Sequence, residues 1–393
     1  MRHVKLNPTT EQKKLLNKFA DHARYTYNKA VELVNAGASA NKMRLRNELV
    51  TKKDNDFFND KEWLLETPKV IRQQAVFEAC KNFKACFTNL KNQNIKRFAV
   101  RFKSKKTKEW TIGVEQQLKA IDAEGENADN AKKKLVILPK CGINEVRYYG
   151  SLPFDDVPGT DCSLRKDKRG CYFLMVPVKK RTLTICRNDE RPVVALDPGV
   201  RNFLTGFRSD SAAFILGDGF ASRLVGILQY VDAIDKQMTS VNALQRQRLK
   251  KKKLLLFQKY KDVRDEFQWK VINWLTQEHS LILLPQLQTS KLSRSPRTKG
   301  NREMLHAGHY TFLQRLKHKC RERNVGLMIV DEDYTSKTCG SCGTLVNVGS
   351  SKTFSCDTCS FITDRDINGA RNILLKHMRV TSIDPVALRK ALG

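Results

Sequence analysis

The sequence predicts an α/β protein in two parts, an N-terminal lobe of helices and short strands followed by a layered α/β domain. Two observations lead to this prediction. Helical periodicity and strand-like segments share the first 190 residues, and from residue 192 the order is three strands, a helical region, a strand, a helix and a strand. Such an order is typical of a sheet covered by helices. At roughly 100–200 residues per domain, the 393 residues have room for two or three domains.

The N-terminal lobe is predicted to contain two long helices. Residues 9–35 begin with Thr9-Thr10-Glu11-Gln12, a capping-box signature, and continue with apolar residues at helical spacing. Thr67-Pro68 is a second start signal, followed by apolar positions from Val76 to Leu90 at helical spacing. We expect this second helix to pack on the first.

Between residues 97 and 190 the sequence favours β structure. Short segments rich in β-branched and aromatic residues occur at 110–114, 145–149 and 172–178. They predict a small barrel or sheet. The polar stretch Asp122–Asn130 is expected to be an exposed loop.

The second part of the chain starts with Val193–Leu196, an apolar strand that ends at Asp197-Pro198-Gly199. Apolar runs and periodicity predict further strands at 203–207, 212–216, 281–284 and 325–330, and helices at 221–256, 259–277 and 309–323. This order indicates an RNase H-like α/β layer.

Charge and composition limit the classes of function. The chain carries 72 Lys and Arg residues against 41 Asp and Glu, a net charge of +31, which indicates a polyanionic partner such as nucleic acid. No apolar run approaches the ~18 residues of a membrane span, and the first residues lack a secretory signal. We therefore expect an intracellular protein with no membrane partner. Seven of the 11 cysteines have no repeated spacing and are expected to be reduced thiols.

The other four cysteines form a metal-binding pattern. Cys339-x2-Cys342-x13-Cys356-x2-Cys359 brings together four thiolates, the ligand set of tetrahedral zinc. Gly340 and Gly343 are expected to supply the tight turns between the paired thiolates. Four unrelated buried thiols are the alternative. A site with four cysteine ligands has no open position, so the zinc is predicted to be structural.

Two aspartates are candidate ligands of a catalytic metal. Asp197 ends an apolar strand, and Asp366 lies at the start of a predicted helix, seven residues after Cys359. Hydrolysis of nucleic acid by two Mg²⁺ ions requires convergent carboxylates. Asp197 is alternatively a turn residue before Pro-Gly, and Asp364 or Asp366 is alternatively a helix N-cap. Since one cap is sufficient, we favour Asp366 as a ligand.

These residues resemble a known family. Four ordered motifs are similar to those of the TnpB and Fanzor group of transposon-linked RNA-guided DNA nucleases: Asp197 after Val-Val-Ala-Leu, Thr335–Gly343, the second cysteine pair, and Arg365–Ala370. Weaker similarity occurs at Leu6–Gln12, Tyr27-Asn28 and Arg101–Lys105, so the resemblance extends over most of the chain.

The resemblance implies a RuvC nuclease domain of RNase H fold with an inserted zinc ribbon, and an N-terminal lobe made of a small wedge β-barrel and recognition helices. The implied ranges are 1–191 for the lobe, with recognition helices at about 9–96, 192–338 for the first part of the RuvC domain, 339–360 for the zinc ribbon, and 361–393 for the last part of the RuvC domain and the C-terminal tail.

The sequence departs from the family at one catalytic position. The family's second catalytic glutamate ends the strand before a basic loop, but that position falls at Leu284–Leu287, which contains no acid. Three acids, Asp331, Glu332 and Asp333, instead follow the strand 325–330, which we expect to lie beside the strand ending in Asp197. Fanzor-like members have a relocated glutamate just before the Thr-Ser-Lys-Thr-Cys segment, and Glu332 matches it. Asp197, Glu332 and Asp366 would then hold two Mg²⁺ ions. A degenerate nuclease that binds without cutting is the alternative.

Basic residues mark two candidate nucleic-acid contacts. One set lies in the helical region and comprises Arg246, Arg248, Lys250, Lys251, Lys252 and Lys253. The other lies in the loop before residue 303 and comprises Lys291, Arg294, Arg297 and Lys299. Because a solvated helix face usually mixes charges of both signs, phosphate contact is favoured, although Lys250–Lys253 also fits a nuclear-import signal.

Two other groups of residues leave their roles open. Phe102 and Trp110, which lie near basic residues, either stack on bases or pack in the core. His306 and His309 are either exposed residues at a helix start or ligands of a second metal.

The sequence and the resemblance together predict a Mg²⁺-dependent, RNA-guided DNA endonuclease that cuts next to a short flanking motif. Its partners would be a guide RNA and double-stranded target DNA. Base pairing would supply most of the specificity, and by resemblance the N-terminal lobe would read the flanking motif. We expect a monomer, located in the nucleus if the host is eukaryotic. One alternative is a catalytically inactive RNA-guided DNA-binding protein. The other is a zinc-ribbon RNA-binding protein, in which Asp197 and Asp366 would lie far apart.

Overall fold

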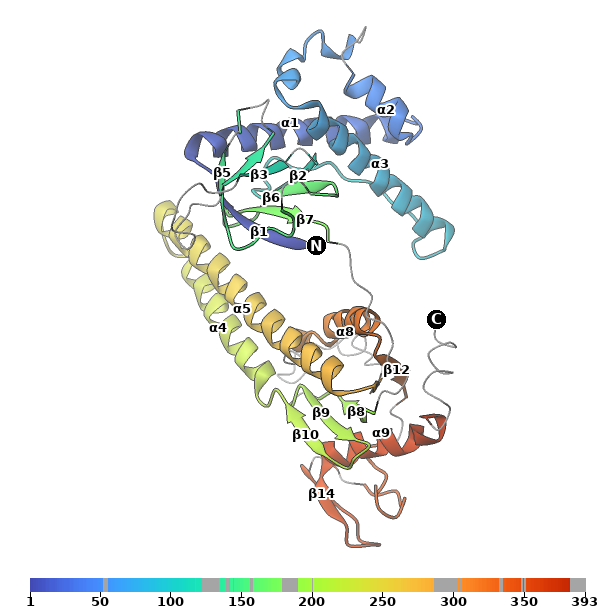
Figure 1. Ribbon diagram of the computed structural model, residues 1–393. Helices are drawn as coiled ribbons and strands as arrows, with labels where there is room; N and C mark the ends of the chain where they lie inside the picture. The colour runs from blue at the N-terminus through green and yellow to red at the C-terminus, as the bar shows by residue number, and fades with distance from the viewer. Residues whose placement is uncertain are drawn as a thin grey trace, which may run out of the picture. The chain divides into compact units, whose positions relative to one another are not determined.

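A computed structural model describes residues 1–51, 56–116, 118–121, 134–138, 142–143, 145–155, 158–178, 190–199, 201–285, 303, 305–331, 335–347, 349 and 351–381. The chain divides into two compact units, Met1–Lys179 and Lys180–Gly393, both shown in Figure 1. None of the described helices is long and apolar enough to cross a membrane. The predicted loop Asp122–Asn130 lies outside the described residues.

The first unit contains a seven-stranded antiparallel sheet with the strand order β2-β6-β7-β1-β5-β4-β3. Its strands are β1 (Arg2–Asn7), β2 (Trp110–Glu115), β3 (Leu118–Ile121), β4 (Lys134–Ile137), β5 (Val146–Tyr149), β6 (Cys162–Lys166) and β7 (Tyr172–Val176). Within the described residues the edge strands β2 and β3 do not pair with each other, so the sheet is an open half-barrel. This confirms the predicted small sheet or barrel.

Strand β1 was not expected from the sequence, yet it occupies the middle of the sheet between β5 and β7. Only Val4 and Leu6 of this strand are buried, and polar residues alternate with them. So short an alternation is a weak signal by itself. Its pairing with β7, from Arg2↔Val176 to Leu6↔Tyr172, joins the two ends of the unit.

Helices α1 (Thr10–Asn35) and α3 (Lys69–Lys91) confirm the two predicted long helices, and the short α2 (Lys42–Leu49) lies between them in sequence. The capping box at Thr9 is formed, since the backbone N–H of Gln12 donates to Thr9 Oγ1 and the backbone N–H of Thr9 donates to Gln12 Oε1. Both helices pack in one core with the sheet, which includes the buried Phe19, Val76 and Leu174.

The second unit contains a five-stranded sheet of order β10-β9-β8-β11-β12. Its elements are β8 (Val193–Asp197), β9 (Leu204–Arg208), β10 (Ala213–Leu216), α4 (Phe220–Gln237), α5 (Ala243–Glu278), β11 (Leu281–Pro285), α8 (His309–Arg323), β12 (Gly326–Val330), β13 (Thr353–Ser355), β14 (Ile362–Asp364) and α9 (Arg365–Thr381). Strands β8, β11 and β12 are parallel, while β9 and β10 are antiparallel to their neighbours. This confirms the RNase H-like order.

The alternation of side chains along β8 puts a different core on each face of the sheet. Val194 and Leu196 pack in a core with residues of α4, α5 and α8, whereas Ala195 packs in a smaller core with Ile373 and Leu374 of α9. Helix α9 therefore lies on the sheet face opposite to the large core.

Two predictions about this unit are wrong. The predicted helix break near residues 257–258 lies inside α5, and the actual break falls at residues 238–242, where Asn242 caps α5 by accepting the backbone N–H of Gln245 at 2.9 Å. Strand β12 pairs with β11, so it does not lie beside β8. The intervening strand separates the ends of β8 and β12 by roughly 10 Å, two inter-strand spacings.

Candidate functional site

Asp197 is the last residue of β8, and its carboxylate lies directly against α9. A Cβ atom added at Gly369 would be 2.7 Å from Asp197 Oδ2, closer than real Cβ contacts come. The absence of a side chain at Gly369 therefore lets the carboxylate approach the helix.

Asp366 lies in the first turn of the same helix, three residues before Gly369 and so on the same face. Asn202 Nδ2 donates to Asp366 Oδ2 at 3.4 Å. Asp364 is the N-cap, because its Oδ1 accepts the backbone N–H groups of Asp366 (2.8 Å) and Ile367 (3.2 Å). The cap role thus belongs to Asp364, and the structure brings Asp197 and Asp366 to the same end of α9.

The third predicted ligand, Glu332, lies outside the described residues, as do Asp333 and Gln286. Asp331, which directly follows β12, is described and exposed. Because β8, β11 and β12 are parallel, their carboxyl ends meet at one edge of the sheet. Strand β11 stands between the ends of β8 and β12, so Asp331 does not lie directly beside Asp197, as predicted, but follows the next strand but one at the same edge of the sheet.

The turn that follows Asp197 is held by His309, the first residue of α8. His309 is buried, stacks on Phe203 at a ring-centroid distance of 4.5 Å, and forms a hydrogen bond with the backbone of Gly199. Burial lowers the pKa of His309 to about 4, so the imidazole stays neutral at the pH of a cell. His306 instead contacts the hydroxyl of Tyr260 through Nδ1 at 3.1 Å.

The four predicted zinc ligands converge. Their sulfur atoms all lie within 4.8 Å of one another, with Cys339–Cys359 and Cys342–Cys356 both 3.6 Å apart. A tetrahedral zinc site with bonds of about 2.3 Å has sulfur atoms ~3.8 Å apart. The donor set and its spacing therefore fit Zn²⁺. Across the described residues, these four make up the one group of three or more His, Cys, Asp or Glu close enough to hold an ion.

Each cysteine pair sits in a hydrogen-bonded knuckle. In the first, Gly343 adopts φ +81° and its N–H donates to the carbonyl of Cys339 at 3.0 Å, as expected for a turn glycine. Gly340 has a different role from the one predicted: a Cβ there would lie 2.9 Å from Asn368 Oδ1, so this glycine permits close packing against α9. Hydrogen bonding with Thr344 lowers the pKa of the Cys342 thiol to about 6, whereas desolvation and hydrogen bonds with the other three cysteines raise the pKa of the Cys359 thiol to about 11.

The first predicted basic set lies on the N-terminal half of α5, which runs beside α4 as a long hairpin (Figure 1). Arg246 donates to the carbonyls of Met238 and Val241 in the turn between the helices, and Lys253 pairs with Asp235 at 2.6 Å. The remaining members, Arg248, Lys250, Lys251 and Lys252, are exposed to solvent. The second predicted set, Lys291, Arg294, Arg297 and Lys299, lies outside the described residues.

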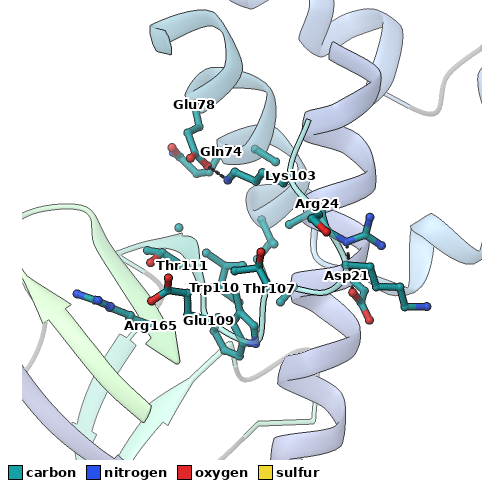
Figure 2. A pocket seen from close by; sticks show the side chains of 18 of the residues that line it. Asp21, Arg24, Gln74, Glu78, Lys103, Thr107, Glu109, Trp110, Thr111 and Arg165 are labelled. Atoms are coloured by element: carbon teal, nitrogen blue, oxygen red, sulfur yellow. Dashed lines mark hydrogen bonds and ion pairs between the residues drawn. The ribbon is translucent and has the colours of Figure 1, made fainter. Parts of the chain in front are cut away.

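The first unit contains a cavity of about 600 Å³ between α1, α3 and β2 (Figure 2). One wall is a strap without helix or strand, residues 101–109, which Asn28 pins to α1 through hydrogen bonds of 2.8 and 3.0 Å with the backbone of Lys103. Phe102 on this strap is 58% exposed and Trp110 is half-buried. The cavity combines acids, bases and amides, including Glu78, Glu109, Gln74 and Arg165.

Two protein families match parts of this chain. Residues 309–373 match the family described as Cas12f1-like, TNB domain, and residues 2–37 match the OrfB_IS605 family described as a helix-turn-helix domain. In this chain residues 2–37 hold β1 and α1, a strand followed by a single helix.

Solved structures show the fold. A Cas12f1–sgRNA–target DNA complex has a TM-score of 0.55 at 13% identity, covering 93% of this chain and 83% of that one. The mini-RNA-guided endonuclease Cas_phi3 has a TM-score of 0.56 at 10% identity, covering 95% and 92%. The fold is therefore that of the RuvC-type nucleases.

Relatives in sequence show the family. The A625R protein of Paramecium bursaria Chlorella virus 1, whose name assigns it to the transposases, is 41% identical over 95% of this chain and 86% of that protein. The TnpB-like protein L79 of Acanthamoeba polyphaga mimivirus is 24% identical over 94% and 72%. InsQ of Escherichia coli K12, named as an RNA-guided DNA endonuclease, is 25% identical over 94% and 90%. The chain belongs to the TnpB-like transposase family.

Sequence reasoning did not foresee the contacts that several residues make in building the site; His309, for example, is buried, not exposed as one interpretation had it. Asn202, Gly369 and His309 act through contacts with residues more than 100 positions away in the chain. Asn368 lies in the quoted Arg365–Ala370 motif, but only the structure shows which backbone groups it binds.

Proposed function

We propose that this chain is an RNA-guided DNA endonuclease. The observation that carries the proposal is the contact between Asp197 and Gly369 on the helix whose first turn carries Asp366, within a RuvC-type fold. A protein that only binds RNA has no need to bring a half-buried carboxylate against a helix whose first turn carries a second one. The activity in the name of the relative InsQ, RNA-guided DNA endonuclease, also supports the proposal.

Asp197, Glu332 and Asp366 would hold two Mg²⁺ ions, since carboxylate oxygens are the protein ligands that Mg²⁺ prefers. When bound, the ions supply an activated water and stabilisation of the leaving oxygen. The protein's own part is to hold the ligands in place. Asn202 orients Asp366, Asp364 caps the helix that carries it, and His309 secures the turn after Asp197.

The basic surface would bind the nucleic acid backbone. Arg248 and Lys250–Lys252 are exposed along one half of α5, and a net charge of +31 supports contact with many phosphates. Arg246 and Lys253 would contribute less, because both already bind groups of the protein. The loop with Lys291, Arg294, Arg297 and Lys299 is proposed as a second contact.

The cavity in the first unit would read a short DNA motif that flanks the target. Base edges present hydrogen-bond donors and acceptors, and recognition needs protein groups of both kinds. Gln74, Glu109 and Arg165 supply such groups around the cavity (Figure 2). The exposed Phe102, which also lines the cavity, adds an aromatic ring. Because the lining is of mixed charge, it suits base edges better than phosphates.

The test is a cleavage assay on the protein co-expressed with the RNA encoded next to its gene. We expect Mg²⁺-dependent cutting of a DNA library at sites matched to the RNA and next to one motif. Glu332→Gln and Asp366→Asn should each lower the single-turnover rate by at least about 10²-fold. Asp331→Asn is the matched control, because it changes the exposed neighbour of Glu332 and should leave the rate within about twofold of the wild type.

Two results would decide against parts of this proposal. Tight binding of RNA and DNA without cleavage would favour a catalytically inactive RNA-guided binding protein. Cleavage that survives Glu332→Gln would remove the glutamate from the ligand set while leaving the nuclease activity established.

A further inference from the structure

We propose that Asn368 and Asn372 are positioning residues that couple zinc binding at the four cysteines to the placement of Asp366. The proposal rests on the proposed nuclease function only for the role of Asp366 as a metal ligand. Every contact that carries it lies within the second unit.

The two asparagines fasten α9 to the backbone of the first zinc knuckle. Asn368 donates through Nδ2 to the carbonyl of Thr338 at 2.8 Å and accepts the N–H of Gly340 through Oδ1 at 3.0 Å. Asn372, one turn further on, donates through Nδ2 to the carbonyls of Thr338 (2.6 Å) and Thr335 (2.8 Å). We call these four hydrogen bonds the asparagine clamp.

The clamp is more specific than ordinary helix packing. Asn368 is 0% exposed and Asn372 is 6% exposed, and burying an amide is costly unless its groups are hydrogen-bonded. Asparagine is also a poorer helix former than leucine, which would fill the same space. Two buried amides that bind successive backbone groups therefore hold the segment Thr335–Gly340 in one position relative to α9.

The clamped segment contains a zinc ligand. Cys339 lies between Thr338 and Gly340, and its sulfur also accepts the N–H of Ser341 at 3.4 Å. Among the described residues of the ribbon, the buried core comprises Cys339, Phe354 and Cys356, with the partly buried Val346 and Phe361 packed against them. Since so small a core stabilises little by itself, the metal contributes most of the folding free energy of such a ribbon.

The same end of α9 carries the proposed catalytic groups. Asp366 lies two residues before Asn368, and Gly369, directly after it, contacts Asp197. A helix moves as a rigid element over one or two turns. A change in the clamp therefore shifts Asp366 and Gly369 together, and zinc loading at the cysteines favours the arrangement in which both aspartates converge.

The experiment measures binding of Mn²⁺, as a spectroscopic probe of Mg²⁺ sites, to the full chain by electron paramagnetic resonance. We compare the wild type, the double variant Asn368→Asp/Asn372→Asp and the control Leu375→Ala, each zinc-loaded and zinc-stripped. Each Asn→Asp change keeps the shape of the side chain but removes the N–H donors that face the carbonyls. Leu375 lies on the same helix, is 45% exposed, and makes no clamp bond. Thiolates are soft ligands and bind Mn²⁺ poorly, so the emptied cysteine site contributes little signal.

Stripping zinc from the wild type should raise the Mn²⁺ concentration for half-saturation at least tenfold, and restoring zinc should reverse the change. Leu375→Ala should behave in the same way. The zinc-loaded double variant should already show the raised value, and stripping should change it less than twofold. An unchanged Mn²⁺ response of the wild type on stripping, or a full tenfold response in the double variant, would overturn the coupling.

The wild-type arm tests the coupling between zinc and the Mn²⁺ site even if the double variant fails to fold, because it needs no substitution. In that case Asn368→Asp and Asn372→Asp are measured singly to test the role of the asparagines. Cleavage of DNA is a separate readout. A wild type that binds Mn²⁺ in a zinc-dependent way but does not cut would refute the nuclease function and leave the coupling standing.

Discussion

The contact between Gly369 and Asp197 predicts that one methyl group on α9 will impair cleavage without unfolding the domain. In Gly369→Ala the new Cβ would lie 2.7 Å from Asp197 Oδ2, whereas ordinary contact begins near 3.4 Å, so the carboxylate has to move by 3.4 − 2.7, about 0.7 Å. Alanine is the better helix former by about 1 kcal/mol, which offsets the strain of the displacement. A misplacement approaching 1 Å at a catalytic group costs up to about 10²-fold in rate, so we expect a 30- to 100-fold loss, on that order of magnitude.

The assay is single-turnover cleavage of matched DNA, with the melting temperature measured on the same preparations. Gly226→Ala on α4 is the matched control, because a Cβ there has no heavy atom within 4 Å. It should keep the wild-type cleavage rate and gain a little stability from helix propensity. A cleavage rate for Gly369→Ala within threefold of the wild type would refute the claim that Asp197 must sit against this helix.

Three further predictions concern stability and reactivity. Burial lowers the pKa of His309 from 6.5 to about 4, so on acidification this histidine is protonated in the unfolded chain before it is protonated in the folded one. About 3 kcal/mol of the free energy of unfolding present at pH 7 is therefore lost as the pH falls from 6.5 to 4. His309→Gln should flatten this dependence in urea unfolding, and an unchanged slope would exclude the histidine as its cause. Burial raises the pKa of Cys320 to about 12, so iodoacetamide at pH 8 should alkylate this thiol only after denaturation. If mass spectrometry finds Cys320 alkylated in the native protein, this prediction is wrong. Asp364→Ala removes the acceptor of two backbone N–H groups and should cost about 1 kcal/mol, while Asp364→Asn should cost less, and equal thermal melts for the two variants would count against the cap.

Much of the fold follows from local patterns in the sequence. The capping box at Thr9, the apolar strand before Asp197 and the spacing of the four cysteines each depend on residues close together in the chain. Such signals survive without knowledge of the partner elements. For that reason the RNase H-like order and the clustering of the four cysteines could be predicted.

Two of the three errors concern features that depend on distant residues. Strand β1 is stabilised by β5 and β7, whose residues lie about 140 to 170 positions later in the chain. Strand β12 pairs with β11, and this pairing could not be predicted because the apolar strands of the sheet look alike in sequence. The break between α4 and α5 was misplaced although Asn242 carried a local cap signal, because the apolar periodicity continues through it.

The candidate site shows the same division. Asp197 and Asp366 stand at positions that sequence alone singles out, one ending an apolar strand and the other following the cysteines. Asn202, Gly369 and the asparagine clamp become visible only when α9 is packed against β8 and the zinc knuckle. A glycine or an asparagine inside a helix carries no sign of the group it will meet.

The most direct test of the account is to change the guide. The RNA that co-purifies with the protein is rewritten in its targeting segment, and cutting is measured on DNA matched to the old and to the new sequence, both next to the same flanking motif. If the chain is an RNA-guided nuclease, cleavage follows the new sequence and is lost from the old one. Continued cutting of the old DNA, or cutting that does not depend on the RNA, would contradict the account.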